Sequence, residues 1–184
     1  YINLKKDYTS YRSRLAVKFE EKLFIAGSTH FGEEEIILNV YRDLLKDYPG
    51  LRLLLAPRHP ERVTEVEKIV VKLGFEPLRI SKLFGSLGLG VTGSQVFILD
   101  TVGQLLSFYA VSDIVFVGGS LIRKGGHNIL EPASQGKPIL FGPYMFNFRD
   151  IAELFRKNQA CVLVRNEQEL KEGIIELLNN PSGA

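Results

Sequence analysis

Short runs of apolar residues alternate along the chain with longer segments in which apolar residues recur every three or four positions. The runs predict β-strands, and the amphipathic segments that follow them predict helices closed by Gly or Pro. Six strand–helix pairs follow one another, with strands predicted at 22–28, 51–57, 95–100, 113–120, 137–143 and 160–165. Because strands this apolar are buried on both faces, the pattern predicts an α/β fold with a Rossmann-like, doubly wound parallel sheet.

Two segments stand outside this pattern. Residues 1–22 are basic and polar with weak helical character, so we expect an arm or linker before a single domain at 23–184. The Gly/Ser-rich stretch "SKLFGSLGLGVTGS" at 81–94 predicts a long surface loop.

Composition narrows the functional classes. The formal net charge is only +2 over 184 residues, and basic residues are interspersed with acidic ones, which does not favour nucleic-acid binding. The single cysteine, Cys161, has no partner for a disulfide or a metal pair, which indicates a reducing compartment. No apolar run approaches the roughly 20 residues of a membrane-spanning helix, and the first residues do not resemble a signal peptide.

Unusual residues follow four of the predicted strands. The segments are "GSTHFGEEE" (27–35), "PRHPER" (57–62), "DTVGQL" (100–105) and "GGSLIRKGGHNILEP" (118–132). Because parallel strands place these loops at one edge of the sheet, the sequence predicts a ligand site there.

The last of these loops combines two Gly-Gly pairs with a polar helix start. Gly118 and Gly119 would let backbone amides approach a ligand or let the chain adopt a positive φ, and Asn128 is predicted to cap a helix aimed at an anion. Glu131 could accept hydrogen bonds from two sugar hydroxyls. The alternative is that the glycines only make turns and that Glu131 only favours the helix dipole.

Arg58 follows its strand directly, between Pro57 and Pro60, which would hold its guanidinium where a phosphate could bind. The alternative is an exposed arginine paired with Glu61 or Glu65. In the 27–35 loop, Ser28 or Thr29 could cap the helix while His30 faces the cleft, and the three Glu suit a helix N-terminus. No His/Cys/Asp set has metal-ligand spacing, so no metal is expected.

The dinucleotide fingerprint and the Walker lysine motif are both absent, which favours a nucleotide-sugar ligand. Six motifs, "STH-x-GEE", "PRHPER", "DT-x-G-x-L", "FVGGSL", "GGHN-x-LE" and "FGP-x-x-FNF-x-D", resemble in order and spacing those of the 3-deoxy-D-manno-octulosonic acid (Kdo) transferase family. The resemblance runs from about Asn3 to the end of the chain. It implies the C-terminal half of a GT-B glycosyltransferase.

The resemblance also implies site residues. Lys5 in "NLKKD" matches a lysine that stabilises the departing charge. The implied CMP contacts are Pro57, Arg58, Val102, Gly103, Gln104, Asn128, Ile129, Leu130 and Glu131. Six more loop residues are candidate donor contacts by position: Ser28, Thr29, His30, Gly118, Gly119 and Ser120. The chain departs from the family at two positions, where Gln104 and Phe31 each replace a Glu that is common there. The change at Gln104 affects only the contact that its side chain would make with CMP.

The activity implied is transfer of Kdo from CMP-Kdo to a lipid A precursor, with inversion and with no metal cofactor. The family's catalytic base, acceptor site and membrane-facing surface belong to an N-terminal domain that we expect to precede this chain. The resemblance places the full protein at the cytoplasmic face of the bacterial inner membrane. Two alternatives are a nucleotide-sugar epimerase of the same fold, acting on a UDP-sugar, and a non-catalytic nucleotide-binding module.

Overall fold

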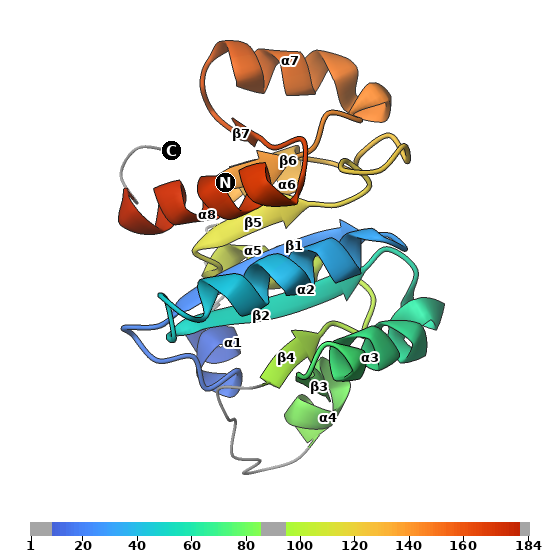
Figure 1. Ribbon diagram of the computed structural model, residues 1–184, viewed down its shortest axis with the longest axis vertical. Coiled ribbons are helices and arrows are strands. Elements are labelled where there is room, and N and C mark those ends of the chain that lie inside the picture. Colours follow the sequence, from blue (N-terminus) through green and yellow to red (C-terminus); the bar gives the residue numbers. More distant parts are fainter. Residues whose placement is uncertain (1–8, 86–94, 181–184) are drawn as a thin grey trace, which may run out of the picture.

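A parallel β-sheet forms the centre of the protein (Figure 1). The computed structural model describes residues 9–85 and 95–180. Within these residues the sheet has seven strands in the order β3-β4-β2-β1-β5-β6-β7, and every neighbouring pair is parallel. The strands are β1 (Lys22–Thr29), β2 (Leu51–Pro57), β3 (Glu76–Arg79), β4 (Gln95–Ile98), β5 (Ile114–Val117), β6 (Ile139–Phe141) and β7 (Val162–Leu163). The predicted doubly wound parallel sheet is confirmed.

Helices cover both faces of this sheet. They are α1 (Thr9–Arg14), α2 (Glu33–Leu44), α3 (Val63–Lys72), α4 (Ile80–Gly85), α5 (Leu105–Val111), α6 (Leu130–Ser134), α7 (Arg149–Lys157) and α8 (Glu167–Asn179), with 3-10 turns η1 (Pro60–Arg62) and η2 (Phe146–Phe148). Figure 1 shows α2, α3 and α8 on the near face and α1 and α5 behind the sheet.

Alternate strand residues supply the two hydrophobic layers. On β1, Phe24 and Ala26 pack with α2, α3 and α8, whereas Leu23 and Ile25 pack with the helices of the opposite face. The same alternation in β2 and β5 explains why these strands consist almost entirely of apolar residues, since both of their faces are covered. Within the described residues, no helix has the length and apolar character needed to cross a membrane.

The order of the strands reverses at β1. From β1 the chain moves to β2 on one side, and β5 later pairs with β1 on the other side. In open α/β sheets, ligands bind beyond the carboxyl ends of the strands at such a switch point. The crevice between the β1 and β5 ends is therefore where the fold favours a site.

Strand β3 and helix α4 were not predicted. Strand β3 lies at the edge of the sheet and begins with exposed Glu76 followed by Pro77, so it lacks the apolar run that marks the buried strands. The prediction of a loop over 81–94 is wrong at its start, because α4 continues to Gly85. The rest of that segment, 86–94, lies outside the described residues.

Residues 9–22, the described part of the predicted arm, pack onto the domain. Leu15 and Val17 are buried in the same hydrophobic layer as α5. Arg12 donates hydrogen bonds to the Asp113 carboxylate at 2.9 Å and to the carbonyl oxygen of Glu21 at 2.6 Å. This segment is therefore held by both apolar contacts and a partly buried ion pair.

We predict that Leu54→Ala lowers the free energy of unfolding by about 2–5 kcal/mol, because Leu54 is fully buried in the centre of β2 and its truncation leaves a cavity. Leu154→Ala on α7 is the control, since Leu154 is 58% exposed, and it should change that free energy by less than about 1 kcal/mol. Urea denaturation of both variants measures the difference. Equal losses would contradict this account of the core.

Candidate ligand-binding site

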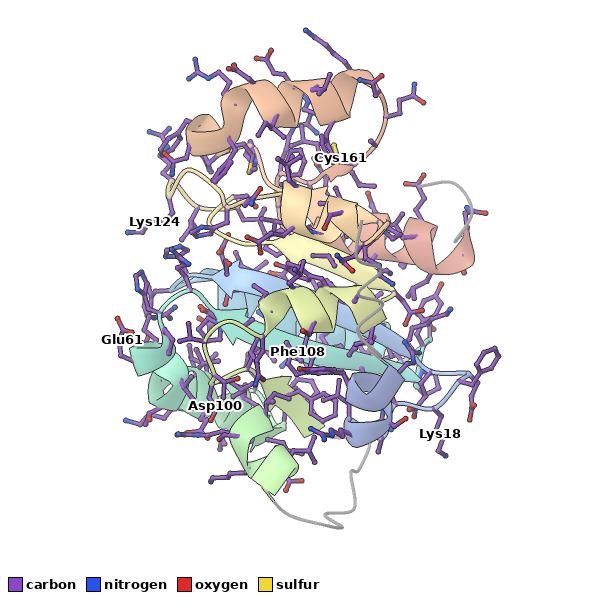
Figure 2. All side chains as sticks on the ribbon, turned by 180° about the vertical axis from the view of Figure 1, so that it is seen from behind. Lys18, Glu61, Asp100, Phe108, Lys124 and Cys161 are labelled. Atoms are coloured by element: carbon purple, nitrogen blue, oxygen red, sulfur yellow. The ribbon has the colours of Figure 1, made fainter. Side chains whose placement is uncertain are left out.

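A pocket of about 520 Å³ opens at the carboxyl ends of the strands. It is lined by Ser28, Arg58, Gly103, Leu105, Leu106, Tyr109, His127, Asn128, Glu131 and Phe148. A smaller hollow of about 170 Å³ shares Ser28, Arg58 and Gly103 with it and adds Pro57 and Val102. Figure 2 shows Lys124 and Glu61 at this edge of the molecule, and Lys18 at the opposite edge.

The pocket brings together residues from all four of the loops singled out in the sequence. Another hollow, of about 370 Å³, lies between α7 and β6 and is lined by none of the predicted site residues. Because the 520 Å³ pocket lies at the switch point and combines charged groups from separate loops, we identify it as the candidate site.

The Glu33 side chain holds the two central loops together beneath the pocket. It is fully buried at the first position of α2. Its Oε2 atom accepts hydrogen bonds from the backbone N–H groups of His30 (3.0 Å) and Gly119 (2.7 Å). Its Oε1 atom accepts from those of Ser120 and Leu121, both at 3.1 Å.

Burial raises the pKa of the Glu33 carboxyl, while its four amide partners act in the opposite direction. All four partners are N–H donors, so a protonated carboxyl would set its own O–H against one of them. The ionised form is therefore the one that fits this geometry.

This arrangement corrects the sequence interpretation of the Gly-Gly turn. The amides of Gly119 and Ser120 donate to Glu33 and do not face a ligand. Gly118 is required by close packing, because a Cβ there would overlap the backbone at Ser28. Glu33 itself does more than favour the helix dipole, since it is the acceptor that orders this turn.

Two of the six candidate donor contacts have side chains directed into the interior. Thr29 is fully buried and donates from Oγ1 to Glu34 at 2.9 Å. Ser120 is fully buried, donates to the Val117 carbonyl oxygen and accepts from the Gly142 amide. Neither Thr29 nor Ser120 lines the pocket, and both hydroxyls have hydrogen-bond partners in the protein interior.

The chain's three histidines, which lie on three different loops, meet beside the pocket. The Nε2 atoms of His30 and His127 are 2.8 Å apart, and the two rings are nearly parallel. His59 lies edge-on to His30, with ring centroids 5.7 Å apart. Burial, and then neighbouring positive charges, lower the pKa of His30 and lower that of His127 to about 4.

Arg58 and Arg62 play different parts at the pocket rim. Arg62 donates to the buried Glu34 carboxylate at 2.8 Å and to Glu65 at 3.2 Å. Arg58 is exposed and lines the pocket, and its guanidinium forms no ion pair with any described residue. The alternative pairing of Arg58 with Glu61 or Glu65 is therefore not seen.

The helix after the second Gly-Gly pair starts later than predicted. Helix α6 begins at Leu130 with Ile129 at the N-cap, so the prediction that Asn128 is the N-cap residue is wrong by one position. Asn128 nevertheless accepts from the Leu130 amide at 3.1 Å and donates to Oε1 of Glu131 at 3.3 Å. These contacts position both polar side chains at the pocket.

The remaining implied contacts differ in their exposure. Ile129 is fully buried, whereas Leu130 is 47% exposed. Val102 is exposed beside Gly103, whose φ of +81° favours glycine. Gln104 accepts from the Thr101 hydroxyl at 2.9 Å.

His127 and Tyr109 line the pocket but were not predicted as site residues. His127 stands in the quoted "GGHN" motif, and its position before Asn128 was the available signal. Tyr109 lies on α5 and packs over Gly27, where a Cβ would overlap the tyrosine hydroxyl. No sequence pattern distinguishes this tyrosine from an ordinary core residue.

Lys5 lies outside the described residues, so its predicted role stays a prediction. Among the residues that the structure describes, no three His, Cys, Asp or Glu side chains are grouped to hold a metal ion.

We predict that Glu33→Gln lowers the free energy of unfolding by at least about 2 kcal/mol, because an amide NH₂ would face two backbone N–H donors in a buried site. Glu35→Gln is the matched control. Glu35 lies in the same helical turn but is exposed and paired with Lys72, so its loss should be below about 1 kcal/mol. Similar losses in urea denaturation would show that Glu33 acts only on the helix dipole.

Comparison with known proteins identifies the family. No protein-family model matches the chain. The 3-deoxy-D-manno-octulosonic acid transferase of Haemophilus influenzae is 41% identical over 163 residues, which are 89% of this chain and 37% of that protein. The protein of the same name from Aquifex aeolicus is 37% identical over 163 residues, 89% of this chain and 44% of that protein. The chain thus spans less than half the length of these relatives.

Solved structures give the same result. The C-terminal CMP-Kdo binding domain of WaaA from Acinetobacter baumannii aligns with a TM-score of 0.86 and 32% identity, covering 96% of this chain and 90% of that one. WaaG, a glycosyltransferase involved in lipopolysaccharide biosynthesis, aligns over 96% of this chain and 43% of its own with a TM-score of 0.58 and 14% identity, which shows a shared fold alone. The expected GT-B half is confirmed, and the chain belongs to the Kdo transferase family, as its C-terminal domain.

Proposed function

We propose that this domain binds CMP-Kdo as a sugar donor in the pocket at the ends of β1 and β5. The observation that carries the proposal is that Arg58, Asn128 and Glu131, from two separate loops, line one pocket at the switch point. The related Acinetobacter domain, named for CMP-Kdo binding, supports the same ligand.

The proposed contacts follow from the chemistry of each group. The planar guanidinium of Arg58, unpaired within the described residues, suits an anionic phosphate oxygen. Glu131 is oriented by Asn128 and suits the ribose hydroxyls, because a carboxylate accepts two hydrogen bonds side by side. Val102 and Gly103 line the adjoining hollow, where their backbone groups would complete the proposed nucleotide contacts.

The proposed reaction of the whole protein is Kdo transfer to a lipid A precursor at the cytoplasmic face of the inner membrane. An acceptor hydroxyl oxygen attacks the anomeric carbon, the bond from that carbon to the CMP phosphate oxygen breaks, and configuration inverts. The hydroxyl proton passes to a general base that we assign to an N-terminal domain. Two cationic residues, Arg58 in the pocket and Lys5 near the start of the chain, stabilise the negative charge that develops on the departing phosphate.

The epimerase alternative is not favoured by the relatives. A putative UDP-N-acetylglucosamine 2-epimerase from Listeria monocytogenes aligns over 92% of this chain and 39% of its own, with a TM-score of 0.52 and 15% identity, which shows the fold alone. Titration with CMP and with UDP separates the two functions, since the proposed donor requires preference for the cytosine nucleotide. Kdo transfer by the complete protein would exclude a purely binding role.

We predict that Arg58→Ala weakens CMP binding by about 1.5–3 kcal/mol, roughly 10- to 150-fold in Kd, the range for a hydrogen bond to a charged group. Arg58→Lys should restore only part of this affinity, because an ammonium lacks the planar fork. Arg42→Ala on α2 removes an exposed arginine outside the pocket and is the calorimetric control. Unchanged affinity in Arg58→Ala would remove Arg58 from the site.

We predict that Glu131→Gln weakens CMP binding and leaves the melting temperature nearly unchanged, because Glu131 is exposed and only one acceptor oxygen is lost. The same substitution should cost 2′-deoxy-CMP less than CMP if Glu131 contacts the 2′-hydroxyl. Equal losses for the two nucleotides would exclude that contact. A lower melting temperature with unchanged affinity would make Glu131 a purely structural residue.

A further inference from the structure

The pair formed by His30 and His127 lies between the pocket and the buried Glu33. His127 lines the pocket, and His30 lies against it on the β1–α2 loop. The main-chain N–H of His30 donates to Glu33, which fixes the backbone on that side of the pair. Both imidazoles are partly buried, whereas the side chain of His59, the third member of the cluster, is 52% exposed.

The 2.8 Å separation of the two Nε2 atoms limits the protons that the pair can hold. One nitrogen must donate and the other must accept, so a single proton lies between them. If both rings were protonated, two N–H groups would face each other. With this hydrogen bond in place the pair can therefore carry no more than one positive charge, because an added proton can bind only at the Nδ1 atom of the donor ring.

Positive groups surround the pair. Arg58 approaches from the β2–η1 loop, Arg62 from η1 and Lys124 from the β5–α6 loop. Burial, and then neighbouring charges, lower the pKa values of the imidazoles. His59 is a further neighbour, and its Nδ1 atom lies 3.5 Å from the Glu61 carboxylate. The nearby carboxylates are largely neutralised. Glu33 is held by four amides, Glu34 by Arg62 and Thr29, and Glu131 stands elsewhere on the pocket wall.

We propose that His30 and His127 form the oxyanion subsite of the pocket, and that the pair takes up one proton from solvent when an oxyanion of the donor binds. An oxyanion beside the pair can accept a charge-assisted hydrogen bond from a cationic ring, which neither neutral ring offers. The anion also offsets the surrounding positive charge, which raises the pKa of the pair. The inference rests on the proposed function and deepens it by naming how the pocket's anion is held.

The direction of the pH dependence follows. Between the low pKa of the empty pair and its higher pKa in the complex, the complex holds more protons than the free components. Donor affinity therefore increases as pH falls through that interval, by up to about tenfold per pH unit for one proton. Above the pKa of the complex, this contribution to affinity is lost.

Histidine NMR gives a direct readout, because the untagged chain contains three histidines and hence three sets of ring signals. We would titrate the ¹⁵N-histidine-labelled chain with CMP at pH 7.5 in the presence of a chelator, and assign the signals with His59→Gln and His127→Gln. We expect the ring nitrogens of His30 and His127 to shift toward the values of protonated imidazole on binding. The His59 signals should change little.

Calorimetry tests proton uptake and its source. CMP binding at one pH in buffers of different ionisation enthalpy should show uptake approaching one proton, and His127→Gln and His30→Gln should abolish it and weaken binding about tenfold or more. His59→Gln is the matched control within the cluster and should retain uptake. Urea denaturation identifies any variant that fails to fold. If one histidine variant does not fold, the other variant and the NMR titration test the proton uptake.

Two ligand arms separate the possible oxyanions. Cytidine lacks the phosphate and should bind without uptake. Uptake with CMP assigns the subsite to the phosphate, and uptake only when free Kdo is added to the CMP-saturated chain assigns it to the sugar carboxylate; both support the proposal. If CMP binds with no proton uptake in either arm, the proposal for the histidine pair is wrong. It is also wrong if a folded His127→Gln variant shows full proton uptake. In both cases the proposed function still stands. Absence of CMP binding would overturn both.

Discussion

The geometry of the pocket depends on one buried carboxylate. Glu33 accepts amide hydrogen bonds from its own loop at His30 and from residues 119–121, more than 80 positions later in the chain. Because β1 and β5 lie on either side of the switch point, this contact fixes the distance between the two loops that any ligand must meet. If the two loops separated, the buried amides of residues 119–121 would lose their acceptor, and the Glu33 carboxylate would lose three of its four donors.

The same contact decides which groups recognise an anion. In many nucleotide-binding folds, free amides after the first strand supply that recognition. Here the amides of the Gly-Gly turn are occupied by Glu33, so the proposed function assigns anion recognition to the cationic and imidazole side chains at the pocket. In that proposal, Arg58 and His127 at the pocket, and His30 against His127, supply the recognition that free amides supply in those folds.

The sequence predicted the fold well because burial on two faces leaves a strong apolar signature. It failed at β3, whose edge position requires no such signature. It placed Arg58, Asn128 and Glu131 at one edge of the sheet, and they do line one pocket. It could not predict that Thr29 points inward, because that depends on Ser28, whose φ of +55° redirects the chain at the strand end.

Gly27 has a consequence for the size of the pocket. Because Gly27 has no side chain, Tyr109 packs directly against β1. The tyrosine therefore lines the pocket as close to the sheet as packing permits. A methyl group at position 27 could not be accommodated by the rigid strand, and the ring would have to move toward the cavity. Gly27 therefore limits the depth of the pocket, although it has no side chain that could contact a bound molecule.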